Sequence, residues 1–217
     1  MSDDQARTLP RIGEAAPDFE AATSRGPVKL ADYHGKWLML FSHPADFTPV
    51  CTTEISTFAR RHGEFQARGV ELLGLSVDSV QSHIAWTHDM AQLGTPIPFP
   101  IIADLDMSIS RRYGMLHPGE SATATVRAVF FIGPKGIVRA MLYYPMSLGR
   151  SVDELLRVFD GLQTADRLGV STPVDWKPGD DVVIPAPKSA AEIETADEAK
   201  AKGYTYHTWY LRTKPQG

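Results

Sequence analysis

The residue with the most reactive chemistry in this sequence is Cys51, its only cysteine, which stands in the stretch SHPADFTPVCTTE (42–54). The Thr-Pro step before it predicts a helix start, with Thr48 as N-cap and Pro49 as the first helical residue. Cys51 then lies in the first turn, where unpaired N–H groups and the positive helix end favour a thiolate. The Thr48 hydroxyl is also within local reach of the sulfur. We therefore interpret Cys51 as a candidate nucleophile.

A helix start alone is too weak to keep a thiol ionised. A free thiol has a pKa of about 8.5, and lowering it to about 6 requires about 3.4 kcal/mol. A helix terminus contributes about 0.3–1 kcal/mol, and at most about 2 kcal/mol. A nearby cation must supply the rest, and most of the rate acceleration must come from positioning and transition-state stabilisation. The alternative is that Cys51 is a small buried apolar residue, as most lone cysteines are.

A single cysteine also limits which chemistry is possible. It excludes an intramolecular disulfide and the usual structural zinc sites, which need at least two cysteines. If Cys51 performs redox chemistry, the second sulfur must come from another molecule. Five histidines are scattered without metal-ligand spacing, and we expect them to be solvated: His62, His83, His88, His117 and His207. The sequence therefore predicts neither a metal nor a cofactor.

The composition is that of an ordinary globular protein, with 43% hydrophobic and 22% charged residues in a chain of 217. A formal net charge of -4, without Lys/Arg blocks, gives no reason to expect nucleic acid as a partner. No apolar run approaches the roughly 20 residues that a membrane helix needs, so we expect no membrane partner. The N-terminal stretch MSDDQARTLP is acidic and polar. We therefore expect a cytoplasmic protein.

Apolar strands alternate with amphipathic helices along the first part of the chain. We expect strands at 37–43, 70–78 and 98–104, and helices at 48–68, 79–93 and 107–114. Gly69 predicts the end of the first helix, and Ser79 predicts the cap of the second.

A hairpin and a closing helix complete this pattern. Two β-rich runs around Gly133-Pro134-Lys135-Gly136 predict the hairpin over 125–144, and an amphipathic helix is expected at 151–168. The order predicts an α/β protein whose central mixed β-sheet is flanked by helices. A thioredoxin-like fold fits, although other α/β sandwiches fit as well. We place this domain at residues 8–168.

The remaining residues, 169–217, are predicted to form an extended C-terminal arm. Four prolines between 170 and 188 favour extended chain, a short helix is expected at 189–203, and alternating aromatic and polar residues at 204–215 indicate an edge strand. Tyrosines and tryptophans in a tail predict packing rather than disorder. The candidate packing partners are the arm's own domain and a second copy of the chain. We favour the second copy, because exposed aromatic patches mark interfaces.

Pro44, Thr48 and Cys51 form a P-x-x-x-T-x-x-C pattern after an apolar strand, which resembles the active-site signature of the peroxiredoxins. With His43, the stretch FSHPADFTPVCTTE resembles the 1-Cys subfamily, which has a long C-terminal arm. The stretches TVRAVFFIGPKG, GRSVDELLRVFDGLQ and WKPGDDVVIPAP resemble the family's arginine strand, closing helix and C-terminal segment. The similarity therefore covers nearly the whole chain.

The resemblance implies a thiol-dependent peroxidase that reduces hydrogen peroxide and organic hydroperoxides. Cys51 would be the peroxidatic cysteine, which attacks a peroxide oxygen and becomes a sulfenic acid. Arg127 would be the required cation and would hold both the thiolate and a peroxide oxygen. Thr48 would hydrogen-bond to sulfur and substrate, and Pro44 would shield the thiolate from water.

The resemblance also implies supporting residues and partners. His43 and Val50 would line the substrate pocket, and Glu54 and Arg150 would support the catalytic groups. An external thiol, either a small thiol or a protein of thioredoxin or glutaredoxin type, would reduce the sulfenic acid. The protein would be a homodimer, with assembly into larger rings left open.

Three other activities compete with this interpretation. Some animal relatives are described as phospholipases with a G-x-S-x-G serine, but here Lys36 occupies that position in HGKWL (34–38). A cysteine hydrolase could use His43 as its base, yet Thr-Pro-x-Cys with Arg127 suits a peroxide better than an acyl carbonyl. The remaining alternative is a non-enzymatic redox sensor or thiol-regulated chaperone that uses the same cysteine.

Overall fold

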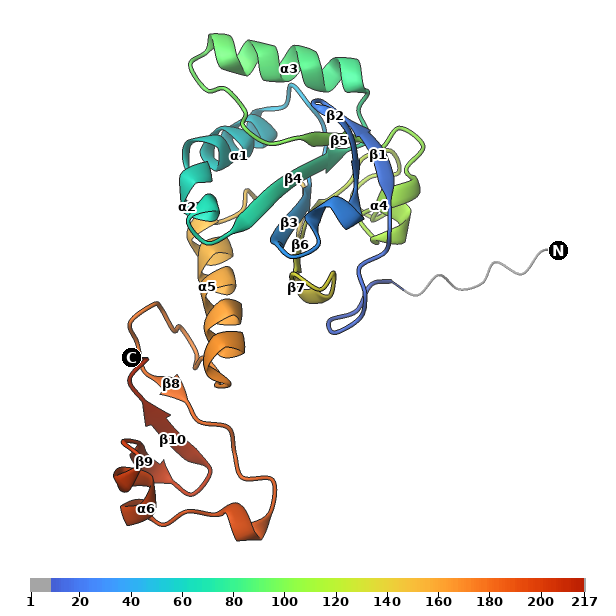
Figure 1. Cartoon of the computed structure of the whole chain (residues 1–217). Coiled ribbons are helices and arrows are strands. Elements are labelled where there is room, and N and C mark those ends of the chain that lie inside the picture. Colours follow the sequence, from blue (N-terminus) through green and yellow to red (C-terminus); the bar gives the residue numbers. More distant parts are fainter. Residues whose placement is uncertain (1–8, 217) are drawn as a thin grey trace, which may run out of the picture. The chain divides into compact units, whose positions relative to one another are not determined.

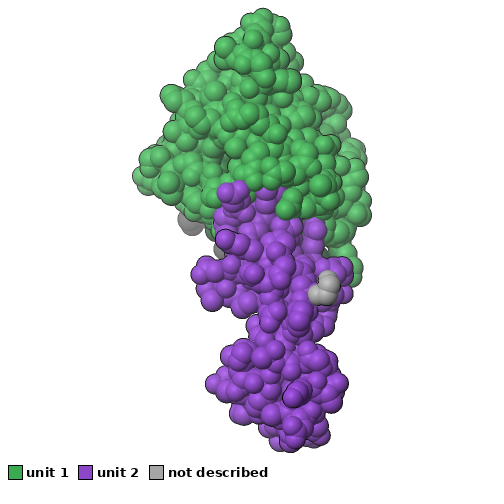
Figure 2. All heavy atoms as spheres, turned by 90° about the vertical axis from the view of Figure 1, so that its left-hand side faces the viewer, with its two compact units in different colours: residues 1–152 green, residues 153–217 purple. Residues whose placement is uncertain are grey.

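The computed structural model describes residues 9–216, which form two compact units, one ending at Val152 and the other beginning at Asp153 (Figure 2). The sequence-based boundary between residues 168 and 169 falls inside the second unit, and the division into a peroxiredoxin domain and an arm stays a prediction. Each unit is described separately below.

The first unit is built on one mixed sheet of seven strands in the order β2-β1-β5-β4-β3-β6-β7 (Figure 1). Its strands are β1 (Glu20–Thr23), β2 (Gly26–Lys29), β3 (Trp37–Ser42), β4 (Val70–Ser76), β5 (Ile101–Ala103), β6 (Arg127–Ile132) and β7 (Val138–Tyr144). Strands β3, β4 and β5 are parallel, whereas β6 runs antiparallel to β3 and β7 runs antiparallel to β6. The expected α/β fold with a central mixed sheet is confirmed.

Strand β3 lies inside the sheet, and all six of its residues are buried. A strand covered on both faces is apolar along its whole length rather than alternating, which explains the run WLMLFS. The predicted hairpin is confirmed as β6 and β7, and the strands predicted at 70–78 and 98–104 are confirmed as β4 and β5. Strands β1 and β2 were not predicted, because the short segments EAAT and GPVK have little β-propensity or alternation.

Helices α1 (Pro49–Arg60), α2 (His62–Gln66), α3 (Val80–Gln92) and α4 (Ser108–Arg112) and the 3-10 turn η1 (Leu30–Tyr33) complete this unit. The single helix expected over 48–68 is wrong, because the chain leaves helical geometry at Arg61, with φ -100° and ψ 10°. Gly63, which weakens helix propensity, follows two residues later. The start of α3 is confirmed, since the Ser79 side chain accepts a hydrogen bond from the Ser82 N–H at 3.1 Å.

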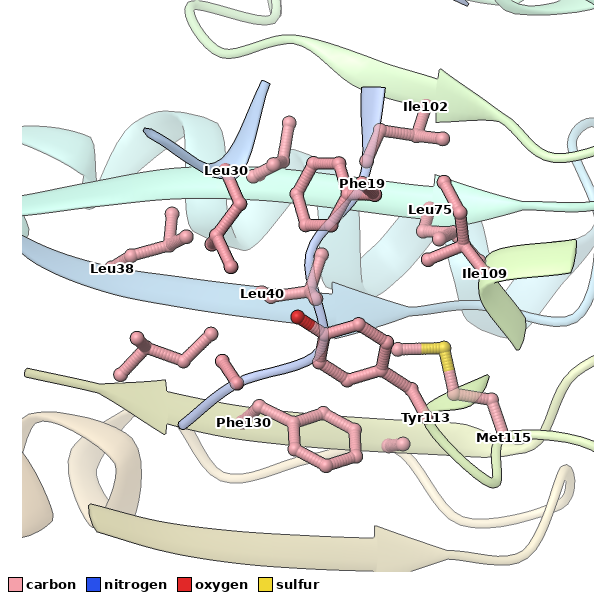
Figure 3. Packing of buried hydrophobic residues seen from close by; sticks show 14 of the residues in the cluster. Phe19, Leu30, Leu38, Leu40, Leu75, Ile102, Ile109, Tyr113, Met115 and Phe130 are labelled. Carbon is pink, nitrogen blue, oxygen red and sulfur yellow. The ribbon is translucent and has the colours of Figure 1, made fainter. Parts of the chain in front are cut away.

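An apolar cluster fills one face of the sheet (Figure 3). Leu40 of β3 and Phe130 of β6 pair in register and project into it. Phe19 and Tyr113 cover the strands from loops, and the Tyr113 ring lies 5.0 Å from that of Phe130 in an edge-to-face contact. The buried Tyr113 hydroxyl donates to the Pro17 carbonyl at 2.7 Å, so its polar end is satisfied. The cluster therefore fastens the N-terminal segment to the sheet.

The second unit contains helix α5 (Val152–Leu168) from its second residue onward, the turn η2 (Ala190–Glu192), helix α6 (Ala196–Ala201) and a three-stranded antiparallel sheet. The sheet has the order β8-β10-β9, formed by β8 (Val182–Val183), β10 (Leu211–Lys214) and β9 (Thr205–Thr208). The closing helix is confirmed. The single edge strand expected at 204–215 is wrong, because the chain turns at Trp209-Tyr210 and forms two strands.

The aromatic residues of this unit divide into buried and exposed groups. Trp176 is only 1% exposed and packs with Val170 and Val182, which supports the expectation that the tail is packed rather than disordered. Trp209 and Tyr210 remain 47% and 55% exposed. The helix expected at 189–203 is shorter and divided into η2 and α6. None of the helices in the described part of the chain is long and apolar enough to cross a membrane.

We predict that Leu40→Ala destabilises the first unit by about 2–5 kcal/mol, because it leaves a cavity beneath a strand that cannot collapse. Leu40 is fully buried, whereas Leu93 is 80% exposed. Leu93→Ala is therefore the matched control, with little expected change. Urea unfolding followed by tryptophan fluorescence measures both, and equal midpoints for the two variants would contradict this packing.

Candidate active site

The loop between β3 and α1 carries the signature residues. Strand β3 ends at Ser42, and α1 begins at Pro49 after Thr48, whose φ of -109° and ψ of 147° are those of an N-cap. Cys51 is thus the third residue of α1, as the sequence predicts. The residue before Thr48 is Phe47, which has a φ of 54°, a left-handed conformation that is strained for an aromatic residue. The loop is therefore sharply turned directly before the helix.

Thr48 occupies the N-cap position but does not cap the helix with its side chain. Its hydroxyl donates instead to the Ala45 carbonyl at 2.8 Å. Its own carbonyl accepts from the Thr52 N–H at 2.9 Å, which is the first bond of the helix. The predicted N-cap position is therefore confirmed, whereas the Thr48 hydroxyl is directed back into the loop.

Arg127, the first residue of β6, reaches Cys51 across the end of the sheet. Its Nη1 lies 3.4 Å from the Cys51 Sγ and 2.6 Å from Oε2 of Glu54. Its Nε and Nη2 donate to the Met146 carbonyl at 3.0 and 2.7 Å. The side chain is 3% exposed. All three nitrogens of the guanidinium group are therefore engaged, and its position beside the sulfur is fixed.

Glu54 joins this arginine to a second one. Its carboxylate accepts from Nε and Nη2 of Arg150 at 2.9 and 2.8 Å, and from the Arg150 backbone N–H at 2.7 Å. Burial alone would raise the pKa of Glu54, but the charges and hydrogen bonds of Arg150, together with Arg127, outweigh burial and lower it. Two guanidinium groups thus face one carboxylate, and this trio carries one net positive charge beside the sulfur.

Arg150 also ties the trio to the sheet. Its Nη1 donates to the Ser42 and Ala128 carbonyls at 2.9 and 3.1 Å, at the adjoining ends of β3 and β6. Its guanidinium lies 5.3 and 5.5 Å from the ring centroids of Phe41 and Phe58, within the range of cation–π attraction. The charged cluster is therefore held between the strand ends and the aromatic side of α1.

Exposure around the sulfur is low. Cys51 is completely buried, and Pro44 is buried as well, whereas Val50 is half-buried. Cys51 is nevertheless not enclosed only by hydrocarbon, because the Arg127 guanidinium touches its sulfur. The loop beside the sulfur includes Phe47, which is 55% exposed.

His43 is fully buried and belongs to a second polar cluster. Its Nε2 lies 3.0 Å from Oδ1 of Asp46, and Oδ2 of Asp46 lies 2.8 Å from Nδ1 of His83. Burial lowers the pKa of His43, although its bond to Asp46 opposes the shift. No protein group in the described residues bonds to the His43 Nδ1.

The expectation that His83 is solvated is wrong, because the residue is completely buried. It lies on α3 three residues before Trp86 and seven before Met90, which are also buried. That helical spacing of apolar neighbours was the sequence signal that could have placed His83 on the inner face. Asp46 and Asp78 were missed as well, and the loop sequence contains no comparable signal for them.

His43, Asp46 and Asp78 bring three ligand-type atoms within 4.8 Å of one another. These atoms are already engaged, since Asp78 Oδ2 accepts from the Asp46 N–H at 3.0 Å and from the Ser76 hydroxyl at 2.6 Å. The group therefore forms a closed hydrogen-bonded set. A cation would have to displace these bonds before it could bind.

Fold and site together define an α/β protein of thioredoxin-like type in which an arginine guanidinium group contacts a single thiol. A model of the AhpC/TSA family matches residues 12–141, and a model of the C-terminal domain of 1-Cys peroxiredoxin matches residues 161–199. The chain belongs to the AhpC/TSA family, the peroxiredoxins. It is a thiol-dependent peroxidase with 1-Cys features, as the sequence predicts.

Individual relatives agree along almost the whole chain. A peroxiredoxin of Aquifex aeolicus is 51% identical over 95% of this chain and 97% of the relative, and peroxiredoxin 2 of Caldanaerobacter subterraneus is 50% identical over 94% and 92%. Among solved structures, a yeast mitochondrial 1-Cys peroxiredoxin superposes with a TM-score of 0.84 at 40% identity, over 95% of this chain and 100% of the other. A 2-Cys peroxiredoxin of Plasmodium vivax gives a TM-score of 0.73 at 35% identity, over 79% and 92%.

We predict that Glu54→Gln lowers stability at neutral pH by roughly 3–5 kcal/mol, because it leaves two buried guanidinium groups without their carboxylate. The folded pKa of Glu54 is depressed, so its stabilising effect is complete above the unfolded value of about 4.3 and is lost as the pH falls through the folded value. The difference between variant and wild type should therefore shrink in acid.

Urea unfolding at a series of pH values measures this effect. The matched control is Glu64→Gln, which removes a carboxylate paired with Arg61 at the surface and should change stability little at any pH. A constant difference between Glu54→Gln and wild type from neutral to acid pH would contradict the depressed pKa.

Proposed function

We propose that Cys51 is the peroxidatic nucleophile and that Arg127 is the cation that activates it. The observation that carries this proposal is the 3.4 Å contact between Arg127 Nη1 and Cys51 Sγ. A thiolate completes the charge balance of the cluster, because Arg127, Arg150 and Glu54 carry one net positive charge. Nucleophilic attack by a cysteine requires the thiolate rather than the thiol.

In the proposed reaction, the thiolate of Cys51 attacks one oxygen of a hydroperoxide. The S–O bond forms as the O–O bond breaks, and the departing oxygen takes up a proton and leaves as water or an alcohol. The sulfur is oxidised to a sulfenic acid and the peroxide is reduced. Negative charge moves to the departing oxygen in the transition state, and the Arg127 guanidinium is placed to stabilise it.

The remaining residues have supporting roles in this proposal. Glu54 and Arg150 hold the Arg127 guanidinium against the sulfur. Pro44 excludes water from the thiolate, and Thr48 hydrogen-bonds to the peroxide when substrate replaces its contact with Ala45. The half-buried position of Val50 and the free Nδ1 of His43 support their assignment to the pocket wall, where Nδ1 can accept a hydrogen bond from a peroxide O–H.

A reductant from outside the chain must complete the cycle, because the sequence has no second cysteine. The yeast relative is described as resolved through glutathione and thioredoxin systems, and we propose a small thiol or a thioredoxin- or glutaredoxin-type protein here. Such thiols are kept reduced in the cytosol, which supports a cytoplasmic location. Mass spectrometry of peroxide-treated Cys51 tests this, since the true reductant removes a single added oxygen and an inactive thiol does not.

We also propose that the protein is a homodimer. Strand β7 is an edge of the main sheet, and its Tyr143 is 39% exposed; such edges tend to pair with another chain. The exposed Trp209 and Tyr210 offer a second contact surface, and larger rings remain an extension of this proposal. Light scattering on the purified protein tests the assembly, and a monomer at micromolar concentration would contradict it.

The central experiment follows peroxide consumption with dithiothreitol in large excess. We predict many turnovers per wild-type chain and none for Cys51→Ser, because the alcohol is too weak a nucleophile. The matched control is Thr53→Ala, an exposed residue of the same helix, which should keep wild-type turnover. Circular dichroism checks that each variant folds.

Two outcomes would contradict the proposed function. Residual turnover in a folded Cys51→Ser variant would exclude Cys51 as the nucleophile. Consumption of only one peroxide per wild-type chain, despite excess thiol, would instead indicate the redox sensor that the sequence left open.

A further inference from the structure

A second buried ionic cluster lies behind the loop that carries Pro44 and Thr48. The carboxylate of Asp46 is its centre and is 1% exposed. Its Oδ1 lies 3.0 Å from His43 Nε2. Its Oδ2 lies 2.8 Å from His83 Nδ1 and accepts a hydrogen bond from the Ser82 hydroxyl, also at 2.8 Å. The proposed chemistry at Cys51 uses neither Asp46 nor His83, so their arrangement requires a separate explanation.

The hydrogen bonds of His83 determine its protonation. Its Nε2 lies 3.0 Å from the Ile102 carbonyl, which can only accept. That nitrogen therefore carries a proton. Its Nδ1 faces the Asp46 carboxylate at 2.8 Å, which also accepts when ionised. A neutral imidazole has only one N–H, so it cannot donate to both partners.

A proton therefore lies between His83 Nδ1 and Asp46 Oδ2, and its location decides the charges. Imidazole is more basic than a carboxylate by about 2.6 pKa units in the ordinary scale. Oδ2 additionally accepts from Ser82, and Oδ1 accepts from His43, both of which favour the ionised carboxylate. The proton accordingly belongs to nitrogen.

We infer that His83 is a buried imidazolium, that it is the counter-ion of Asp46, and that it thereby keeps His43 neutral with its proton on Nε2. In this role Asp46 and His83 are positioning residues for the peroxidase reaction, because they act through His43 and the loop. The charge assignment stands on the hydrogen bonds alone. Its kinetic consequence rests on the proposed place of His43 in the peroxide pocket.

The tautomer of His43 follows from the same assignment of hydrogen-bond donors and acceptors. Its Nε2 donates to Asp46, which leaves Nδ1 as an unprotonated acceptor with no partner among the described protein groups. A buried acceptor without a partner destabilises the folded state. His43 nevertheless stays neutral, because His83 already balances the charge of Asp46 and a second buried positive charge would have no counter-ion.

Removing the imidazolium would shift this balance. Asp46 would then be a buried anion without a counter-ion, and His43, already bonded to it, is the nearest base that could take up a proton. Protonation of His43 would convert the Nδ1 acceptor into a donor. Two other ionisable residues lie near this cluster. Asp78 accepts a hydrogen bond from the Asp46 backbone N–H, and Arg150 donates to the backbone carbonyl of Ser42, the residue before His43.

The same cluster also fixes the loop. The Asp46 backbone N–H donates to Asp78, its side chain binds His43, and the Thr125 hydroxyl donates to the His43 carbonyl at 2.8 Å. These bonds hold the chain on both sides of Pro44. The ionic cluster therefore sets the position of the loop as well as the charge of His43.

Nitrogen-15 NMR of the imidazole rings in the full-length protein tests the charge assignment. We expect His83 with both ring nitrogens protonated at neutral pH, and His43 with only Nε2 protonated. In His83→Asn, which supplies an amide without a charge, His43 should carry two protons at neutral pH. His88→Asn is the matched control, because it makes the same change at an exposed site on α3, and it should leave the His43 signals unchanged.

A second variant keeps the test decisive if His83→Asn does not fold. Asp46→Asn preserves the hydrogen-bond pattern without the anion, and there His83 should become neutral and lose its Nδ1 proton. An unprotonated His83 nitrogen in the wild type at neutral pH would overturn the inference. A His43 that remains neutral in folded His83→Asn would overturn it as well.

The kinetic consequence is measured by stopped-flow oxidation of the reduced protein by hydrogen peroxide across pH. In His83→Asn, protonation of His43 at lower pH removes the Nδ1 acceptor for the peroxide O–H. The rate constant should therefore fall by up to about tenfold as the pH drops through the new His43 titration, which is the effect of losing one hydrogen bond. Wild type and His88→Asn should lack this step. If the NMR shift occurs without the kinetic step, the positioning role is overturned and the place of His43 in the pocket fails, while Cys51 turnover remains intact.

Discussion

The structure depends on a buried positive charge that faces a single sulfur. Arg127 and Arg150 share one carboxylate, Glu54, and the remaining positive charge lies against Cys51 at 3.4 Å. Buried ions are tolerated only where they are paired and hydrogen-bonded, and here carboxylate and carbonyl oxygens accept hydrogen bonds from both guanidinium groups. Under the proposed function, the Cys51 thiolate is the remaining partner of this charge, so the contacts that stabilise the cluster are the same contacts that activate the sulfur.

The sheet brings these partners together from distant parts of the sequence. The ends of β3 and β6 meet where Arg150 binds the Ser42 and Ala128 carbonyls, and α1 leaves the same edge with Cys51 and Glu54 in its first two turns. The loop between β3 and α1 thus lies between two ionic clusters, one at Cys51 and one at Asp46. This arrangement explains how a strained turn at Phe47 can persist beside a reactive residue.

Local features were predictable from sequence because local chemistry decides them. The helix start at Pro49, the cap at Ser79 and the hairpin of β6 and β7 each have a residue signature. The roles of Glu54 and Arg150 came only from family resemblance, since the contact spans 96 residues. The burial of His83 was missed because histidine itself is neutral as to burial, and the helical spacing to Trp86 and Met90 was the only local signal. The turn at Trp209-Tyr210 was missed because it contains none of the Gly, Pro, Asn or Asp residues that usually mark a turn.

The most direct test is the rate at which hydrogen peroxide oxidises Cys51 in the reduced Arg127→Gln variant. Loss of a preorganised donor beside the reacting atoms should lower the second-order rate constant by roughly 10²–10³-fold. The same substitution at the exposed Arg60 of α1 should leave the rate unchanged. A folded Arg127→Gln variant that reacts as fast as wild type would show that the guanidinium contact does not activate the sulfur.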